Sequence, residues 1–280
     1  MNKALAIFEL MRLDKPIGIY LLLWPALLAL VISTNGDFEY ADLLIVITGS
    51  ILVRSAGCVI NDIWDKDLDG GVERTKTRPI PSKKLSISES WTVFAILGVL
   101  SLMLLSLTNT NTIYVSICFG LMIVIYPLTK RFFIGPQIFL GLTFNPTIII
   151  YAMTNELNNP TMIFLYFAIA AKTIAFDSFY GLCDIDDDKK LGINSTPLWW
   201  GSKTLLIISI LQFIVITLLF IVGLKAGLSF AWYIGIILLS GFYFYQHRLA
   251  SQKNFLLAFK NNHWASLYLL LLSGFCFLII

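Results

Sequence analysis

The chain has 280 residues, of which 58% are hydrophobic and only 13% are charged. Soluble globular chains carry about 25% charged residues, and a charged side chain in hydrocarbon costs about 2.5–3.5 kcal/mol on insertion scales, so this composition excludes an ordinary soluble protein. The net charge of +3 is too small to indicate a nucleic-acid partner, and the partner we expect is a lipid bilayer.

Apolar runs of about the length of a membrane span follow one another along the whole chain. A transmembrane helix needs roughly 20 apolar residues. We therefore expect an all-α integral membrane protein, forming one membrane-embedded domain over residues 1–280. About nine transmembrane helices are predicted, at 16–34, 41–60, 89–107, 111–128, 132–153, 161–183, 203–223, 227–245 and 263–280.

The basic residues alternate between the two sides of these runs. Seventeen of the 20 Lys and Arg residues fall in the N-terminal segment and in the loops after the second, fourth, sixth and eighth runs, whereas the opposite loops hold only Lys225. Arg54 and Lys172 lie inside runs. Because basic loops stay in the cytoplasm, the pattern predicts a cytoplasmic N-terminus in a bacterial inner membrane.

Acidic residues gather in two short clusters on the predicted cytoplasmic side. Four runs separate the clusters, so we expect two related four-helix halves and a ninth helix, with the halves bringing the clusters face to face. The clusters hold nine of the 17 acidic residues: Asp62, Asp65, Asp67, Asp69 and Glu73 after the second run, and Asp184, Asp186, Asp187 and Asp188 at the end of the sixth.

The first cluster predicts a site for a divalent cation. Asn61, Asp65 and Asp69 are four residues apart, so on a helix they would share one face, where their oxygens repel one another. Carboxylate and amide oxygens suit Mg²⁺, which also takes phosphate oxygens as ligands. The cluster has no His or Cys, which argues against Zn²⁺. The alternative is a solvated polar loop.

The second cluster continues along one face of the sixth predicted helix. Asp177, Tyr180, Asp184 and Asp188 stand at positions i, i+3, i+7 and i+11. Metal ions bridging the two clusters would hold a diphosphate between them, and ionisation of an allylic C–O bond requires that leaving group to be neutralised. We expect Asp65 and Asp184 to be the catalytic members.

Basic residues near the clusters are candidates for substrate binding. Arg54 lies seven residues before Asn61, about two helical turns deeper, and its planar guanidinium matches a carboxylate. We expect it to bind the carboxylate of an aromatic acceptor; the alternative is a structural ion pair with Asp177. Lys172 is either structural or reaches the pocket.

Three further residues are expected to hold the oxygens of the diphosphate. Arg74 follows the first cluster, and Tyr126 and Lys130 lie four residues apart at the end of the fourth run. Tyr126 offers a hydroxyl and Lys130 a positive charge. The alternative for the basic residues is that they only set the membrane topology.

The order of these motifs resembles the UbiA superfamily of intramembrane prenyltransferases, most closely its 4-hydroxybenzoate polyprenyltransferase branch. The first signature, Asn-Asp-x-x-Asp-x-x-x-Asp, is similar to residues 61–69. Further similar segments lie at 12–18, 74–79, 126–131 and 177–196, whereas the last third of the chain shows only a hydrophobic pattern.

This resemblance implies a nine-helix fold around a central cavity that opens sideways to lipid. It implies transfer of a polyprenyl group from polyprenyl diphosphate to the ring carbon ortho to the hydroxyl of 4-hydroxybenzoate, in ubiquinone biosynthesis. It implies that Arg74 and Lys130 contact the diphosphate and that Arg54 contacts the aromatic carboxylate. The implied Mg²⁺ ligands are Asn61, Asp65, Asp69, Asp184 and Asp188, and Asp177, Tyr126 and Tyr180 are expected among the substrate-binding residues.

Other functions remain open at this point. Phe144 to Thr147 departs from the family pattern, so a sister prenyltransferase with a naphthoate, homogentisate or haem acceptor is an alternative. A transporter is another, because Arg54, Lys172 and Asp177 are charges within predicted spans. Polar groups of a transporter should gather near the bilayer midplane, whereas these clusters lie at one surface.

Overall fold

The computed structural model describes residues 3–71 and 74–278. Over these residues every regular element is helical, so the all-α prediction is confirmed. Glu73, which belongs to the first acidic cluster, lies outside the described residues.

All nine predicted runs contain helix, and the described residues add two short helices, α1 and α9, outside the runs. In chain order the elements are α1 (Lys3–Leu10), α2 (Ile17–Ser33), α3 (Tyr40–Trp64), the 3₁₀ turn η1 (Asp69–Gly71), α4 (Ile87–Leu105), α5 (Thr110–Thr129), α6 (Pro136–Thr143), α7 (Thr147–Met153), α8 (Thr161–Leu191), α9 (Thr196–Trp200), the 3₁₀ turn η2 (Gly201–Lys203), α10 (Thr204–Ala226), α11 (Phe230–Ser251) and α12 (Phe255–Leu278).

Six helical segments of the described chain are long and apolar enough to cross a membrane, judged by length and composition. The protein is therefore an integral membrane protein. Of the other three predicted runs, α2 is apolar but shorter, with 17 residues. Helices α11 and α12 are long enough, with 22 and 24 residues, but carry polar side chains such as Gln246 and Asn262.

The fifth predicted run is broken into α6 and α7 at Phe144, Asn145 and Pro146. Proline has no N–H group and disfavours helical geometry at the residue before it, which explains the break. The side chain of Asn145 forms hydrogen bonds with backbone groups near the break. Its Oδ1 accepts one from the Thr147 N–H (3.2 Å), and its Nδ2 donates one to the Tyr166 carbonyl (2.8 Å). Such compensation is required because lipid offers no hydrogen-bonding partners.

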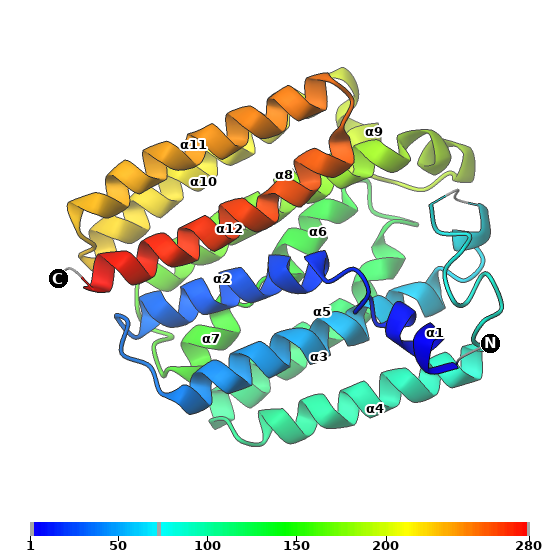
Figure 1. Ribbon diagram of the computed structural model, residues 1–280, viewed down its shortest axis with the longest axis horizontal. Coiled ribbons are helices and arrows are strands. Elements are labelled where there is room, and N and C mark those ends of the chain that lie inside the picture. Colours follow the sequence, from blue (N-terminus) through cyan, green and yellow to red (C-terminus); the bar gives the residue numbers. More distant parts are fainter. Residues whose placement is uncertain (1–2, 72–73, 279–280) are drawn as a thin grey trace.

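The helices surround a cavity of about 1370 Å³. Helix α12 packs against both α2 and α8, so it joins the first and last parts of the chain (Figure 1). Side chains from each of α2 to α8 and from α12 line the cavity, whereas in the described part of the chain α10 and α11 contribute none. The largest buried apolar cluster lies beside it and includes Leu30, Tyr151 and Trp232.

The two ends of the cavity differ in character. Ile45 at the start of α3 and Leu104 at the end of α4 line one end, together with Ile149 and Met153 of α7. The other end, where α3 and α8 finish, is lined by Asp62, Asp65 and Asp69 of the first acidic cluster and by Asp184 and Asp188 of the second. The fold therefore places charged groups and an apolar pocket in one continuous space.

Candidate active site

The cavity brings together predicted site residues that lie up to 134 positions apart in the sequence, from Arg54 to Asp188. All the residues predicted for the site line it: Arg54, Asn61, Asp65, Asp69, Arg74, Tyr126, Lys130, Asp177, Tyr180, Asp184 and Asp188. Their roles as ligands or substrate contacts stay predictions, but their shared location is a property of the fold.

The predicted common helical face of the first cluster is wrong for Asp69. Helix α3 ends at Trp64, Asp65 is its C-cap, and Asp69 begins the 3₁₀ turn η1. Clustered acidic side chains and Gly70 disfavour continued helix. The Asp69 N–H still donates to the Asp65 carbonyl (2.8 Å), so the turn returns the Asp69 carboxylate to the neighbourhood of α3.

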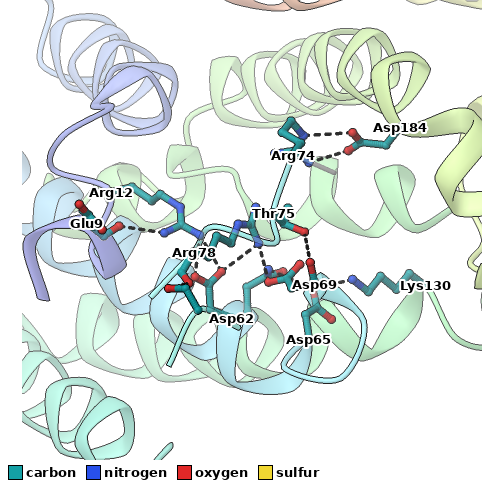
Figure 2. Close-up of polar contacts among 12 residues, drawn as sticks. Glu9, Arg12, Asp62, Asp65, Asp69, Arg74, Thr75, Arg78, Lys130 and Asp184 are labelled. Carbon is teal, nitrogen blue, oxygen red and sulfur yellow. Dashed lines mark hydrogen bonds and ion pairs between the residues drawn. The ribbon is translucent and has the colours of Figure 1, made fainter. Parts of the chain in front are cut away.

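Asp65 is almost fully buried, and only one of its two carboxylate oxygens has hydrogen-bond partners. Its Oδ2 accepts hydrogen bonds from Lys130 Nζ (2.5 Å) and Asn61 Nδ2 (3.1 Å), as Figure 2 shows for Lys130. Its Oδ1 is buried without a hydrogen-bond partner. Burial raises the pKa of the Asp65 carboxyl above its ordinary value, although Lys130 acts in the opposite direction. The carboxylate thus has an oxygen free for a further cation.

Arg74 connects the first acidic segment to the second. Its Nε and Nη2 donate to the two carboxylate oxygens of Asp184 (3.0 and 2.5 Å; Figure 2). Its Nη1 donates to the Tyr180 hydroxyl. Its guanidinium carbon lies 4.5 Å from the centre of the Tyr180 ring. Through these contacts the loop after α3 covers the acidic end of α8.

Asp188 lies one turn beyond Asp184 on α8. Burial, reinforced by the nearby charge of Asp184, raises the pKa of the Asp188 carboxyl to about 6.

Arg54 lies deeper in the cavity and has an unused donor. Its guanidinium carbon is 5.2 Å from the centre of the Phe144 ring, and its Nε is buried without a hydrogen-bond partner. Gly18 makes room for it, since a Cβ at that position would overlap the guanidinium. Arg54 and Asp177 form no ion pair among the described residues, so the structural alternative considered for Arg54 is not what the structure shows.

Comparison with known proteins decides the family. The chain matches the UbiA prenyltransferase family over residues 22–278. The chain belongs to the UbiA prenyltransferase family. The 4-hydroxybenzoate octaprenyltransferase of Pseudomonas aeruginosa strain LESB58 is 40% identical over 269 residues, which cover 94% of this chain and 90% of that protein.

Solved structures of other UbiA family members share the fold. The apo structure of a UbiA homolog from Aeropyrum pernix K1 has a TM-score of 0.79 at 22% identity, covering 90% of this chain and 94% of that one. A UbiA homolog from Archaeoglobus fulgidus, bound to GPP and Mg²⁺, has a TM-score of 0.75 at 17% identity, covering 98% of this chain and 100% of that one. At these identities the likeness shows the fold alone.

This UbiA family member has a buried cluster of ion pairs beside the site. The sequence did not predict this cluster. Asp62 is 1% exposed and accepts hydrogen bonds from Arg12 (2.8 and 2.6 Å) and from Arg78 Nη1 (3.1 Å). Arg78 also donates to Asp69 (2.8 Å; Figure 2). Arg12 is 50 residues from Asp62 in the sequence, so no local pattern revealed the pair.

Helix α12 supplies a cavity wall that the sequence also did not predict. Leu256, Phe259, Lys260 and His263 line the cavity and are spaced i, i+3, i+4 and i+7, which is one helical face. The Nδ1 of His263 accepts a hydrogen bond from Trp24 Nε1 (2.7 Å). The polar stretch from Lys260 to His263, near the start of a helix that is mostly apolar, is the signal that could have identified this wall.

Lys172 holds helices together instead of reaching the cavity. It is 4% exposed and donates to Ser266 Oγ (2.5 Å) and to the Asn262 carbonyl (3.4 Å), both on α12. It is absent from the residues that line the main cavity in the described chain. Of its two readings from the sequence, the structure supports the structural one.

The predicted metal ligands do not converge around one point. Over residues 3–71 and 74–278, no three His, Cys, Asp or Glu residues form a group that could hold a metal ion. Instead, Asp65 forms an ion pair with Lys130, and Asp184 forms one with Arg74. The donor set nevertheless fits Mg²⁺, because it contains only carboxylate and amide oxygens and because one buried oxygen of Asp65 has no partner.

Proposed function

We propose that this protein transfers a polyprenyl group from polyprenyl diphosphate to the ring carbon ortho to the hydroxyl of 4-hydroxybenzoate, as a step of ubiquinone biosynthesis. One observation carries the proposal: a single cavity joins paired acidic and basic groups at one end to an apolar pocket at the other. A polyprenyl diphosphate has the same two-part character. The names of the curated relatives support the choice of acceptor.

The charged end of the cavity binds and activates the diphosphate. Asn61, Asp65, Asp69, Asp184 and Asp188 would hold Mg²⁺, which when bound neutralises the negative charge that develops on the leaving diphosphate. Arg74 and Lys130 donate to diphosphate oxygens, as charged donors do most strongly. Tyr126 and Tyr180 add hydroxyl groups. The C1–O bond of the allylic diphosphate then breaks, and the bonding electrons leave with the diphosphate.

The deeper residues orient the aromatic acceptor. Arg54 binds the carboxylate of 4-hydroxybenzoate with the guanidinium that has an unused Nε. The ring then faces the allylic C1, and the carbon ortho to the hydroxyl forms the new C–C bond. That carbon loses its proton to a carboxylate of the acidic clusters, and the ring regains aromaticity.

The apolar end holds the isoprenoid tail and keeps water from the reacting carbon. Ile45, Leu104, Ile149 and Met153 offer no hydrogen-bonding groups in their side chains. Such a pocket solvates chains of different length by apolar contact alone, so we expect several prenyl chain lengths to be accepted.

The same proposal includes the location of the site. The distribution of Lys and Arg supports a bacterial inner membrane with the N-terminus and both acidic clusters on the cytoplasmic side. The water-soluble aromatic acid would then reach Arg54 from the cytoplasm, and the prenyl donor would arrive from the bilayer. The whole chain, residues 1–280, would act as one domain.

The decisive experiment uses membranes that contain the protein, radiolabelled 4-hydroxybenzoate and geranyl diphosphate, with Mg²⁺ or with excess EDTA. We expect lipid-extractable label only with Mg²⁺. Diphosphate release with another aromatic acid, but not with 4-hydroxybenzoate, would replace the acceptor and keep the chemistry. No diphosphate release with any acceptor, from correctly inserted protein, would favour a transporter.

A further inference from the structure

The acidic face of α8 contains one position without a side chain. Asp177, Gly181, Asp184 and Asp188 are spaced i, i+4, i+7 and i+11, so they follow one another along one face of the helix. All four line the cavity. The face therefore has a gap at Gly181, one turn before Asp184.

The side-chain amide of Gln137 occupies this gap. A Cβ added at Gly181 would lie 3.2 Å from Gln137 Nε2 and 3.1 Å from Pro197 Cγ. Gln137 is the second residue of α6, it is 7% exposed, and it lines the cavity. Glycine at 181 thus lets an uncharged donor from another helix approach the acidic face.

The orientation of the Gln137 amide follows from its one hydrogen bond. The backbone N–H of Thr196, at the start of α9, donates to Gln137 Oε1 (2.8 Å). A backbone N–H can only donate, so the atom facing it is the amide oxygen and Nε2 points away from it. Among the described residues Nε2 donates to no acceptor, although the amide can supply two hydrogens.

Within the protein, the Gln137 amide therefore forms a hydrogen bond through its oxygen and none through its nitrogen, among the described residues. The oxygen caps the first N–H group of α9, which has no partner within its own helix. The nitrogen lies against Gly181 on the acidic face of α8, in a residue that lines the cavity, and it can still donate two hydrogens. An acceptor that enters the cavity would complete it.

We propose that Gln137 is a binding residue for the diphosphate, to which its Nε2 donates a hydrogen bond. This inference rests on the proposed function. The position favours diphosphate over the aromatic acid, because Gly181 lies next to Tyr180 and one turn from Asp184, both of which contact Arg74. An amide donor also carries no charge, so it does not compete with a metal ion for the carboxylates of α8.

The test measures binding of inorganic pyrophosphate with Mg²⁺ to the purified full-length protein by calorimetry. Gln137→Glu keeps an oxygen for the Thr196 N–H but replaces the donor with an oxygen, and Gln137→Met removes both. Since hydrogen bonds to charged groups contribute about tenfold or more in affinity, we expect pyrophosphate to bind about tenfold or more weakly to both variants. Gly181→Ala, which displaces the amide, should act in the same direction.

A matched control is Gln246→Met, because Gln246 is also buried but bonds to Gln212 and Asn261 away from the cavity. It should bind pyrophosphate as the unaltered protein does. Steady-state kinetics should show a raised KM for the prenyl diphosphate in the Gln137 variants and an unchanged KM for the aromatic acid.

Two results would overturn the proposal. One is unchanged pyrophosphate affinity in Gln137→Glu and Gly181→Ala. The other is a KM effect confined to the aromatic acid, which would place Gln137 in the acceptor pocket. If Gln137→Met does not fold, the other two variants decide. Pyrophosphate binding by the unaltered protein does not depend on the acceptor, so a failure of the proposed reaction with 4-hydroxybenzoate is seen separately.

Discussion

At the level of single residues, the two central carboxylates already carry basic partners. Lys130 contacts Asp65 and Arg74 contacts Asp184, so each acid is paired with a base that the proposed mechanism assigns to the diphosphate. In the proposed mechanism, binding of the metal and the diphosphate would exchange these partners, with the carboxylates turning to the cation and the bases to the phosphate oxygens. Such an exchange would link the two binding events.

Removal of either central carboxylate should abolish turnover. Asp65→Ala and Asp184→Ala should insert into the membrane normally but lose at least about 100-fold in rate, since loss of a charge-stabilising group typically costs 10²–10³-fold. Product formation from radiolabelled 4-hydroxybenzoate measures this. Asp187→Ala on the same helix is the control, because Asp187 pairs with the exposed Lys190 (3.6 Å) and should remain dispensable. Full turnover in either variant would refute the metal assignment.

Arg54 should affect the acceptor and not the donor. In Arg54→Lys a compact ammonium replaces the planar fork that matches a carboxylate. We expect the KM for 4-hydroxybenzoate to rise about tenfold or more, with little change in the KM for geranyl diphosphate. Lys172→Met is the control within the same membrane region, because Lys172 bonds to α12 outside the cavity. A rise confined to the KM for geranyl diphosphate would contradict the assignment.

At the level of elements, helix ends and breaks shape the site together with helix interiors. The end of α3 at Trp64 redirects Asp69, and the break between α6 and α7 places Phe144 against Arg54. The long α8, in contrast, carries its whole acidic face on one continuous helix until Gly192 ends it in a left-handed conformation (φ 65°). Regular and irregular backbone thus both contribute residues to the site.

The ion cluster around Asp62 should stabilise the junction of the N-terminal segment, α3 and the loop that follows it. Asp62→Ala would leave Arg12 and Arg78 without their buried partner, and breaking such a pair costs about 3–5 kcal/mol. Thermal unfolding in detergent measures this loss. Glu9→Ala, which removes a more exposed pair with Lys84, should cost about 0–1 kcal/mol. Equal stability of the two variants would show that the Asp62 cluster is not structural.

At the level of the whole molecule, the cavity requires a defined orientation in the membrane. In a protein without its native cysteines, a single Cys at Lys83 and a single Cys at Lys225 lie on opposite predicted sides. A membrane-impermeant maleimide should label Lys225→Cys in intact cells and Lys83→Cys only after permeabilisation. The reverse result would place the acidic clusters outside and remove the cytoplasmic route proposed for the acceptor.

Much of this protein could be predicted from the order of its residues because hydrocarbon imposes simple rules. Apolar runs had to be helices, since lipid cannot satisfy backbone groups. Charges that remain in such a chain are expensive, so Arg54 and the acidic clusters stood out as candidate site residues. The family resemblance followed from the same motifs, and all the predicted site residues line one cavity.

Only the tertiary structure decided how these groups meet. It showed that Asp69 leaves the helix, that Lys172 fastens α12 to α8, and that Gln137 fills the gap beside Gly181. The last two depend on contacts between segments distant in sequence. The sequence by itself determined which polar residues lie in apolar surroundings, where their burial has an energetic cost. Packing determined their partners, because a buried charge or donor must be paired with a group on whichever element the fold places beside it.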